Sequence, residues 1–363
     1  MALTELTLTA VRNLEPVSLH PSLRINLLHG VNGSGKTSLL EAIHLLGMGR
    51  SFRGSKPQAS ISHQQSVLTV FGRVVQGDGR LVSLGISRNI GGALSIRFDG
   101  KTSKTLAPLA LALPIQLINQ DSFRLLEGPP SVRRQLIDWG AFHVEPGFYS
   151  AWKRLQLALQ QRNSWLRHGI INDQERLPWD QQFCLAAEEV DRYRHNYVMA
   201  LQSVFAAILT ELSPLEGINL SYRRGWDRRR NLSEALEANL ERDRQMGFTY
   251  SGPQRADLVI RQHGQPATDK LSRGQQKMVV SALRLAQARL LSETRHQDCV
   301  FLIDDLPSEL DPANRTALCR ILERLGTQAF ITGIERQALE IGWDQETPIG
   351  RFHVEHGHIH QEQ

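Results

Sequence analysis

Eight consecutive residues near the N-terminus match the phosphate-loop pattern G-x-x-x-x-G-K-[ST] at every fixed position. They are Gly30-Val31-Asn32-Gly33-Ser34-Gly35-Lys36-Thr37. The glycines let backbone N–H groups turn toward the phosphates of a nucleotide, Lys36 reaches the β- and γ-oxygens, and Thr37 ligates Mg²⁺. An apolar run at 25–28 leads into the loop, and apolar residues at helical spacing follow it at 39–46. A strand, a loop and a helix whose positive end faces the anion therefore predict a nucleoside triphosphate site rather than an ordinary Gly-rich turn.

A second pair of residues suited to nucleotide chemistry ends an apolar run much later in the chain. Asp304 and Asp305 follow the run 299–303, which is typical of a central strand in a parallel sheet. One carboxylate at such a strand end can hold Mg²⁺, and its neighbour can orient or deprotonate the attacking water. Without the phosphate loop, the pair would equally fit a helix cap or a turn. Far more sequence separates the pair from Lys36 than the roughly 30 residues of one βαβ step, so we expect a split ATPase core.

The composition indicates a folded protein. Of the 363 residues, 41% are apolar and 22% are charged, which provides core for one large or two ordinary domains. Residues 1–10 lack the features of a signal peptide, and no apolar run approaches the roughly 18 residues of a membrane helix. We therefore expect a cytoplasmic protein without a membrane partner. The three cysteines lack C-x-x-C spacing and fit reduced core thiols, and the net charge of +5 permits a polyanionic partner without establishing one.

Strand-like and helical patterns divide the chain into an α/β part and a helical part. Strand-like runs joined by Gly-rich turns occupy 2–11, 25–28, 67–75, 81–86 and 94–98. Beyond Ser251 a strand is expected at 258–261, a helix at 272–292 and the apolar strand at 299–303. The fold class predicted is α/β, with a mixed sheet and flanking helices.

The middle of the chain predicts an antiparallel helical hairpin. Apolar residues at three- and four-residue steps begin at Phe148 and again at Phe183, and only Arg162 and Arg194 interrupt them. The polar stretch 167–178, which contains Gly169 and Pro178, is the expected link between the two helices.

The segment Leu271-Ser272-Arg273-Gly274-Gln275-Gln276-Lys277 opens an amphipathic helix. Ser272 with Gln275 three residues later predicts a capping box. A cap does not require Gly274, so we interpret Ser272, Gly274 and the helix N–H groups as facing a γ-phosphate.

These parts resemble those of the ATP-binding-cassette ATPases, whose signature is L-S-G-G-Q or a near variant; here Arg273 replaces the first glycine. The order of parts is also similar: phosphate loop, Gln120 as the glutamine loop, signature, Asp304-Asp305, then 308–311 as the D-loop. The resemblance implies ATP and Mg²⁺, with Gln120 sensing the γ-phosphate beside the metal and Asp305 activating water. In that family the signature of one subunit completes the ATP site of another, which implies an ATP-dependent homodimer.

Within these ATPases, several motifs look specifically like the RecF family of bacterial recombination mediators. They are Arg12-Asn13-Leu14, Gly49-Arg50-Ser51-Phe52-Arg53, Arg133-Arg134 after Gly128-Pro129-Pro130, Ser251-Gly252-Pro253-Gln254-Arg255-Ala256-Asp257-Leu258, and Asp304-Asp305-Leu306. Together they extend over nearly the whole chain. The resemblance adds Arg12 and Asn13 to the nucleotide-binding candidates. It implies an ATPase head over 1–122 and 246–363, and a helical arm carrying the hairpin over 123–245.

The resemblance also implies a function and partners. The expected protein is a weak, DNA-stimulated ATPase that binds single-stranded, gapped or duplex DNA and, with RecO and RecR, promotes RecA loading, replication-fork maintenance and SOS induction. One feature departs from the pattern, because cassette ATPases commonly place a switch histidine after the strand that follows the D-loop. The segment 331–335 contains no histidine, and Thr332 and Glu335 are the candidate replacements.

Two basic clusters could contact DNA. One run combines two aromatics with five arginines: Tyr222, Trp226, Arg223, Arg224, Arg228, Arg229 and Arg230. That mixture suits phosphate contact and base stacking. The second cluster holds Arg50, Arg53 and Lys56. For both, a solvated charged surface is the alternative interpretation.

Four histidines crowd the C-terminus, at positions 353, 356, 358 and 360. Their spacing matches no common set of metal ligands. We expect a final hairpin that turns at His356-Gly357, with Phe352, Val354 and Ile359 facing inward.

Other classes of protein share some of these parts. The nucleotide-binding subunit of a cassette transporter has the loop, signature and carboxylates, but it would normally lack so large a helical insertion. A chromosome-organising protein of the SMC type has a coiled coil far longer than 121–251 could supply. A binding module that never hydrolyses ATP stays open, because a sequence reveals catalytic parts and not their rate.

Overall fold

The structure, a computed structural model, describes residues 1–54, 56–168 and 173–362. The chain divides into two compact units. Unit 1 comprises Met1–Ser122, Glu211–Ser213 and Lys277–Gln363, and unit 2 comprises Phe123–Thr210 and Pro214–Gln276. Among the described residues, no helix has both the length and the apolar character needed to cross a membrane.

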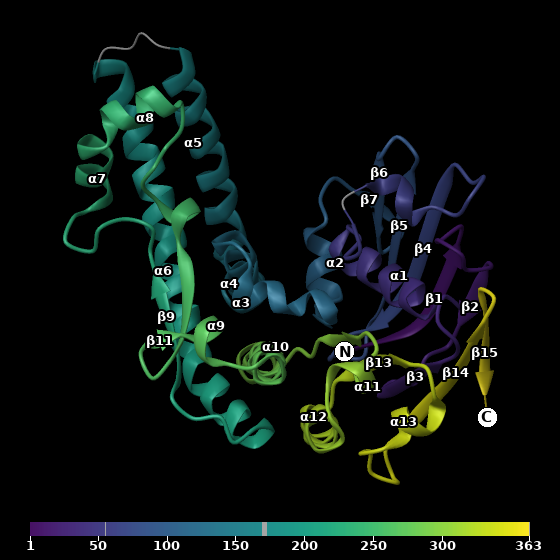
Figure 1. Ribbon diagram of the computed structural model, residues 1–363. Coiled ribbons are helices and arrows are strands. Elements are labelled where there is room, and N and C mark those ends of the chain that lie inside the picture. Colours follow the sequence, from purple (N-terminus) through teal and green to yellow (C-terminus); the bar gives the residue numbers. More distant parts are fainter. Residues whose placement is uncertain (55, 169–172, 363) are drawn as a thin grey trace. The chain divides into compact units, whose positions relative to one another are not determined.

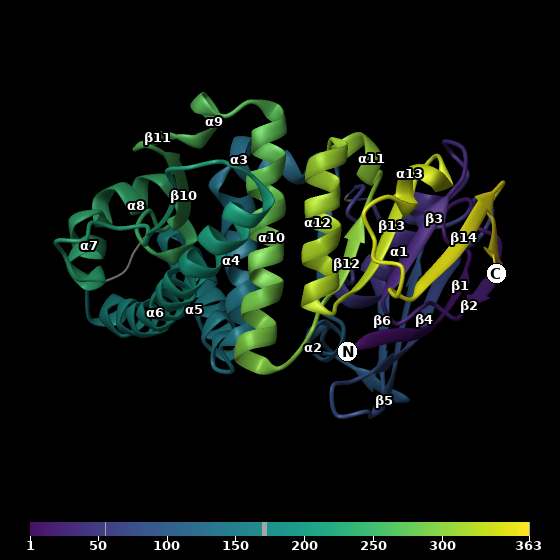
Figure 2. The ribbon, with the colours of Figure 1, turned by 90° about the horizontal axis from the view of Figure 1, so that it is seen from below.

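A six-stranded, mostly parallel sheet forms the centre of unit 1. Its order is β15-β14-β3-β13-β12-β8, and only the edge strand β15 runs antiparallel. The strands are β3 (Ile25–His29), β8 (Ile115–Ile118), β12 (Val300–Ile303), β13 (Gln328–Gly333), β14 (Ile349–Glu355) and β15 (His358–Glu362). All residues of β12 and β13 are buried, as expected for central parallel strands. Figure 2 shows β12, β13, β3 and β14 side by side.

A second, antiparallel sheet of six strands packs into the same core. Its order is β2-β1-β4-β5-β6-β7, from β1 (Ala2–Thr9), β2 (Val17–Leu19), β4 (Val67–Val75), β5 (Leu81–Asn89), β6 (Leu94–Phe98) and β7 (Lys101–Ser103). Alternate residues of β4, among them Leu68, Val70 and Val74, point into a core shared with α1 (Lys36–Met48). The other helices of unit 1 are α2 (Ala107–Ala112), the part of α10 (Arg273–Arg295) from Lys277 onward, α11 (Leu306–Glu309), α12 (Pro312–Leu325) and α13 (Arg336–Glu340).

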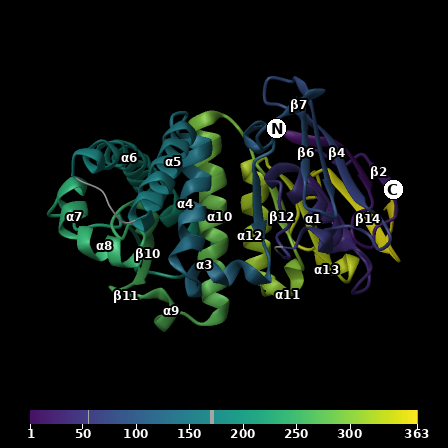
Figure 3. The same cartoon turned by 90° about the horizontal axis from the view of Figure 1, so that it is seen from above.

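Unit 2 is built on the predicted helical hairpin. Figure 1 shows α5 (Phe148–His168) and α6 (Asp173–Leu212) running side by side. The helix α4 (Pro130–Val144) packs against α5 (Figure 3). Around them lie α3 (Arg124–Glu127), α7 (Leu232–Ala238), α8 (Leu240–Met246), α9 (Ala267–Lys270) and a small sheet of β9 (Ile218–Arg223), β10 (Asp257–Gln262) and β11 (Gln265–Pro266).

The predicted link between the two long helices was wrong in one respect. Pro178 lies inside α6, which begins at Asp173, and not in a loop. A proline removes one helical hydrogen bond, at a cost of about 3 kcal/mol or more, and the buried face of a long helix can outweigh that cost. Gly169, the other residue of the predicted link, lies outside the described residues.

The two arginines that interrupt the apolar pattern are buried rather than turned to solvent. Arg162, on α5, is fully buried and donates to Asp180 Oδ1 on α6 (2.7 Å) and to Asp243 Oδ2 on α8 (2.8 Å). Arg194, on α6, makes a two-point pair with Asp138 on α4 at 2.7 and 2.9 Å. Each arginine is therefore a cross-link between helices of unit 2, and its charge is compensated where it is buried.

Replacing Arg162 by methionine is expected to destabilise unit 2 by about 3–5 kcal/mol, because Asp243 would remain buried without its cation. The measurement is urea unfolding followed by tryptophan fluorescence, since Trp343 is the only one of the 6 tryptophans outside unit 2.

The matched control is Arg154→Met, also on α5. Arg154 pairs with Glu189 at the surface, with exposed side-chain fractions of 55% and 30%. Losing an exposed pair costs about 0–1 kcal/mol. Equal losses in the two variants would contradict a structural role for the buried arginine.

Candidate functional site

The phosphate loop connects β3 to α1, as its sequence context predicted. Gly30 has φ of 149°, and a Cβ built there would meet the carbonyl oxygen of Val354 at 2.1 Å. Gly35 has φ of 122°, and its Cβ would meet Cδ2 of Leu14 at 2.7 Å. Both positions therefore need glycine for backbone conformation and for close packing.

Lys36 turns back onto its own loop. Its Nζ donates to the carbonyl oxygens of Gly30 (2.7 Å) and Val31 (2.8 Å), and the residue is only 8% exposed. Burial lowers the pKa of Lys36, while the nearby carboxylates of Asp305 and Asp304 oppose that shift. A cation held in this way is placed to bind phosphate oxygens.

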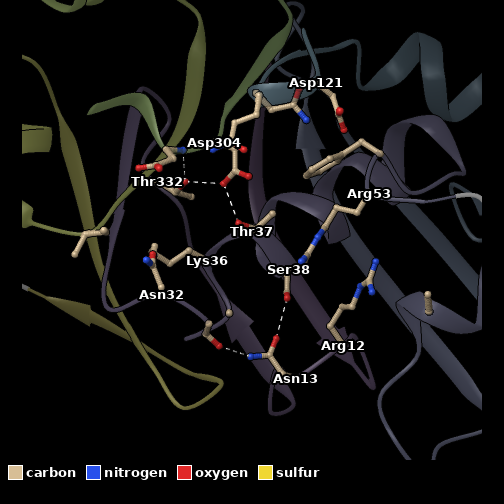
Figure 4. A pocket seen from close by; sticks show the side chains of 18 of the residues that line it. Arg12, Asn13, Asn32, Lys36, Thr37, Ser38, Arg53, Asp121, Asp304 and Thr332 are labelled. Carbon is tan, nitrogen blue, oxygen red and sulfur yellow. Dashed lines mark hydrogen bonds between the residues drawn. The ribbon is translucent and has the colours of Figure 1, made fainter. Parts of the chain in front are cut away.

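A hydrogen-bonded cluster joins the ends of β12 and β13 to the start of α1. Asp304 Oδ1 accepts hydrogen bonds from Thr37 Oγ1 (2.9 Å) and Thr332 Oγ1 (2.8 Å). Thr332 Oγ1 also accepts the backbone N–H of Asp305 at 2.8 Å. Figure 4 shows Thr37 and Thr332 converging on Asp304.

Asp305 adopts a left-handed conformation with φ of 55° and ψ of 51°, unusual for a residue other than glycine. It is the second residue after β12 and directly precedes α11. The carboxylates of Asp304 and Asp305 both line the cavity described below. Strained backbone of this kind is often found where a side chain must be aimed at a reacting group.

The oxygens of this cluster fit a magnesium ion. The hydroxyl of Thr37 and the carboxylate of Asp304 lie 2.9 Å apart, and both are hard oxygen donors of the type that Mg²⁺ prefers. Among the residues that the structure describes, no group of three or more His, Cys, Asp or Glu side chains forms a metal site. A magnesium ion here would thus need oxygens of a bound nucleotide as well.

Arg12 and Asn13, added by resemblance, support the phosphate loop from the other side. Asn13 Nδ2 donates to the carbonyl oxygen of Gly33 (3.0 Å), and Asn13 Oδ1 accepts from Ser38 Oγ (2.8 Å). Arg12 makes a two-point pair with Glu41 on α1, at 2.8 and 2.9 Å. Figure 4 shows Asn13, Ser38 and Arg12 on the same side of the cavity.

Glu41 is fully buried and binds several residues on the side of the cavity that carries Arg12 and Asn13. It also accepts from Ser60 Oγ at 2.8 Å and lies 4.0 Å from Nη1 of Arg53. Burial raises the pKa of its carboxyl group, but hydrogen bonds from Arg12, Ser51 and Ser60 outweigh burial, so the pKa of Glu41 is lower than usual. The loop that carries Arg53 is thereby tied to α1.

One cavity of about 730 Å³ gathers most of the predicted nucleotide residues in unit 1. Its predicted lining residues are Arg12, Asn13, Asn32, Gly33, Gly35, Lys36, Thr37, Gln120, Asp304 and Asp305. Residues that motif analysis had not assigned to the nucleotide complete the lining: Ser38, Phe52, Arg53, Ala59, Ile61, Asn119, Asp121, Thr332 and Ile334. Of these, Ser38, Asn119 and Asp121 are sequence neighbours of predicted residues, and Phe52 and Arg53 belong to one of the RecF-like motifs, whereas Ala59, Ile61 and Ile334 carried no signal. Thr332 had been a candidate only as a substitute for the switch histidine, and the other candidate, Glu335, is an exposed helix cap outside the lining.

The signature segment lies in unit 2 up to Gln276. The capping box is confirmed: Gln275 N–H donates to Ser272 Oγ (3.3 Å), and Ser272 N–H donates to Gln275 Oε1 (2.9 Å). A Cβ added at Gly274 would meet nothing within 4 Å. The packing of its own chain therefore does not require this glycine, and Ser272 and Gly274 are both exposed.

The arginine run 222–230 differs from the expectation of a free loop. Its two aromatics, Tyr222 and Trp226, are only 7% and 8% exposed, so neither offers a ring for base stacking. Tyr222 is part of β9, and its hydroxyl donates to Asp191 at 2.9 Å. Arg224 pairs with Asp191 (3.1 Å) and covers the ring of Trp226. The correction has a packing cause, since the Tyr222 hydroxyl is bonded to Asp191 on α6 and the guanidinium of Arg224 covers the ring of Trp226.

The remaining arginines of the two clusters are distributed differently. Arg228, Arg229 and Arg230 are exposed, and Arg228 also donates to the carbonyl oxygen of Tyr222 at 2.9 Å. Arg50 is exposed, and Arg53 lines the nucleotide cavity. Arg223 lines a different cavity, which lies in unit 2.

The C-terminal hairpin is confirmed. β14 and β15 pair antiparallel around His356-Gly357, and Phe352, Val354 and Ile359 are buried.

Comparison with known proteins gives one consistent result. The family model described as "RecF/RecN/SMC N terminal domain" matches residues 2–360. The chain is 57% identical to the "DNA replication and repair protein RecF" of Azotobacter vinelandii (strain DJ / ATCC BAA-1303), over 99% of each sequence. It is 56% identical to the protein of the same name from Pseudomonas fluorescens (strain SBW25), over 99% of this chain and 98% of that relative.

Solved structures agree with this result. "Structure of the recombination mediator protein RecF-ATPrS in RecFOR pathway" superposes with a TM-score of 0.85 at 25% identity, and the match covers 99% of this chain and 97% of that one. "Crystal structure of the SmcHead bound to the C-winged helix domain of ScpA" superposes with a TM-score of 0.59 at 16% identity, with coverage of 100% and 97%. The second likeness is one of fold alone.

Replacing Glu41 by glutamine is expected to cost about 2 kcal/mol of stability at neutral pH, since Arg12 would lose a charged partner. The folded-state pKa of Glu41 lies below its usual 4.5, so its contribution is present above pH 4.5 and is lost as pH falls through the lower folded value. The wild-type protein should therefore lose more stability than Glu41→Gln on acidification below pH 4.5.

Denaturant unfolding at a series of pH values measures this difference. Glu5→Gln is the control, because Glu5 pairs with Arg73 at the surface (3.2 Å), where an ion pair contributes little. Parallel stability curves for wild type and Glu41→Gln would contradict the assignment.

Proposed function

The chain belongs to the RecF family, within the proteins that share the RecF/RecN/SMC N-terminal domain, and from this membership we propose that it is an ATP-hydrolysing, DNA-binding protein of replication and recombinational repair. Unit 1 is the ATPase head and unit 2 the helical arm. The observation that carries the proposal is the single cavity in which Lys36, Thr37, Asp304 and Asp305 come together from both ends of the chain.

The side chains of this cavity have distinct roles in hydrolysis. Lys36 exchanges its bonds to the loop carbonyls for the β- and γ-phosphate oxygens, and the N–H groups at the start of α1 receive the same charge. Thr37 and Asp304, with Gln120, would hold Mg²⁺, and the ion would supply positive charge to balance the charge that develops on the phosphates.

Asp305 orients and deprotonates the attacking water. Its left-handed backbone and the bond from its N–H to Thr332 set the direction of its side chain. Thr332 bonds both Asp304 and Asp305, so it can transmit a change at the γ-phosphate from one to the other and take the place of a switch histidine.

The signature segment acts on a nucleotide held by a second copy of the chain. Support comes from the exposure of Ser272 and Gly274 and from the open space beside Gly274. A helix N-terminus without a bulky side chain at this position can approach a γ-phosphate closely. ATP would thus join two copies, and hydrolysis would release them.

The DNA-binding role rests on family membership and on exposed basic residues. The relatives are named for DNA replication and repair, and one solved relative is described as a recombination mediator in the RecFOR pathway. We infer that this chain acts at single-strand gaps with RecO and RecR, promoting RecA loading, fork maintenance and SOS induction. Arg223, Arg228, Arg229 and Arg230 are the candidates of the arginine run that the fold leaves exposed.

The dimer is tested by two substitutions with opposite effects. Asp305→Asn should keep ATP binding and prolong the ATP-bound dimer by slowing hydrolysis at least about a hundredfold, the loss expected for a general base. Ser272→Arg should keep ATP binding and lose dimerisation, because its bulk and charge would stand at the shared phosphate. Light scattering with ATP, ADP or no nucleotide measures the mass, and phosphate release measures turnover.

The control for Ser272→Arg is Gln265→Arg, which adds the same group to the exposed strand β11 of unit 2. It should dimerise normally. An ATP-bound wild-type protein that stays monomeric at micromolar concentration would refute the trans arrangement. A protein that binds ATP but releases no phosphate would instead be a binding module that does not hydrolyse ATP.

DNA binding is expected to depend on ATP and to weaken steeply with salt. Replacing Arg229 and Arg230 by alanine should flatten the plot of log affinity against log salt by up to about 0.9 per lost duplex-phosphate contact. ATPase activity without DNA should be unchanged, because neither residue lines the nucleotide cavity. Unchanged affinity and slope would assign both arginines to a solvated loop.

A further inference from the structure

A second cavity, of about 550 Å³, lies entirely within unit 2. It is lined by Pro129, Pro130, Ser131, Arg134, Arg223, Gly225, Trp226, Tyr250, Gln254 and Arg255. Three of these side chains are guanidinium groups, two are aromatic, and none is a carboxylate. We call this cavity the arginine pocket. Its lining is that of a site for an anion with an aromatic part.

The charge of the arginine pocket is incompletely compensated. Arg255 is exposed and forms no ion pair among the described residues; it lies over the rings of Phe248 and Tyr250, 5.3 Å from each centroid. Arg134 donates to the carbonyl oxygen of Ala256 at 2.8 Å. It forms no ion pair with a carboxylate among the residues that the structure describes. Burial lowers the pKa of Arg134, and nearby Arg194 and Arg255 add to that effect, while Asp138 and Asp257 oppose it.

The carboxylate nearest to Arg223 is already engaged. Asp257 receives two hydrogen bonds from Arg133, at 2.8 and 3.1 Å, and Arg223 reaches it only at 3.5 Å. The side chain of Arg223 is 63% exposed. The pocket therefore gathers cations that an added anion would stabilise.

Two further groups of the pocket wall favour an anion. The 15-residue helix α4 begins at Pro130 with no side-chain cap, and Ser131 in its first turn lines the pocket. Trp226 is 8% exposed, and no residue that the structure describes accepts a hydrogen bond from its indole Nε1–H. A buried donor without an acceptor is rare in a folded protein and is expected where a bound oxygen completes the site.

The pocket is built from segments far apart in sequence. Gly225 has φ of 93°, and a Cβ there would lie 2.3 Å from the carbonyl oxygen of Gly252. The two glycines are also joined by a hydrogen bond from Gly252 N–H to the Gly225 carbonyl oxygen at 3.3 Å. This close approach places the turn that follows β9 beside the loop that carries Arg255. The glycine at 225 is thus required for the pocket to form.

We propose that the arginine pocket binds a backbone phosphate of single-stranded nucleic acid, with the adjoining base against Tyr250. This inference rests on the DNA-binding function proposed above and gives it a location. Tyr250 is 39% exposed, and Arg242 covers one face of its ring at 3.6 Å from the centroid, so a base would pack against the part of the ring left open and the guanidinium plane of Arg255, which lies 5.3 Å from the same centroid. A cavity of this size accommodates one nucleotide, whereas an intact duplex keeps its bases stacked inside.

The first test measures binding of a fluorescein-labelled oligothymidylate by anisotropy, in the presence of ATP, over a series of salt concentrations. The double variant Arg223→Gln/Arg255→Gln should flatten the salt slope by about 0.7, which is the contribution of the one single-strand phosphate contact that the pocket makes. Its ATPase activity without DNA should equal that of the wild type, because neither arginine lines the nucleotide cavity.

The matched control removes the same charge elsewhere in unit 2. Lys153 and Arg192 are exposed, and each lies over a tyrosine ring, at 5.5 and 5.1 Å from the centroids of Tyr149 and Tyr193. Neither lines the arginine pocket. Lys153→Gln/Arg192→Gln should keep the wild-type slope. An equal change in both double variants would reduce the effect to general charge and overturn the assignment.

The second test separates stacking from charge. Tyr250→Ala should weaken oligothymidylate binding roughly tenfold without changing the salt slope, while Tyr250→Phe should bind as the wild type does. An oligonucleotide carrying 5-bromodeoxyuridine, cross-linked by ultraviolet light, should attach to the peptide that contains Tyr250. Cross-links confined to other peptides would overturn the proposal.

The outcomes also distinguish this proposal from the function on which it rests. If the wild-type protein with ATP binds no DNA, the proposed function fails. If it binds DNA and the Arg223→Gln/Arg255→Gln variant binds equally well, only the arginine pocket is refuted. A phosphoserine peptide at the same ionic strength should bind more weakly than the oligonucleotide; tighter binding that the double variant loses would assign the pocket to a phosphoprotein instead.

Discussion

The hydrogen bonds to one carboxylate oxygen, Oδ1 of Asp304, hold together the parts of the nucleotide site. Thr37 begins the helix after the phosphate loop, and Thr332 ends the strand beside β12, so this oxygen joins three segments that are remote in sequence. Parallel strands make the meeting possible, because their carboxyl ends reach the same edge of a sheet. The same edge places Lys36 near both aspartates, so that positive and negative groups balance one another before any nucleotide arrives.

Buried charge that is compensated on the spot recurs in both units. Glu41 fixes Arg12 and the loop of Arg53 beside the nucleotide cavity, and Arg162 fixes three helices of the arm. Such groups cost free energy to bury and are tolerated only with nearly complete sets of partners. The side chains of such groups are held in one orientation, because any other orientation would leave a buried charge without a partner. Both clusters can therefore position neighbouring functional groups better than an apolar contact of the same size.

Arginine content and arginine availability differ within this protein. In the run 222–230, Arg224 is held by Asp191 and lies over Trp226, and one nitrogen of the exposed Arg228 is bonded to a backbone carbonyl. The arginine pocket instead collects Arg134, Arg223 and Arg255 from three separate segments. Basic residues that folding brings together from separate segments can form a lining without carboxylates. Basic residues that are adjacent in sequence can instead be paired with carboxylates of the elements that pack against them. This difference explains why a basic run is a weak guide to a binding surface.

The sequence by itself determined the phosphate loop, the strand that carries Asp304 and Asp305, the capping box at Ser272 and the helical pair of the arm. Each depends on residues close together in the chain, whose spacing is set by local geometry. Only the tertiary structure decided that Thr332 bridges the aspartates, that Phe52, Arg53 and Ile61 complete the cavity, and that Pro178 stays within a helix. These outcomes depend on which distant segments pack together, and a local pattern carries no record of that, because the favourable contacts exist only once the chain has folded.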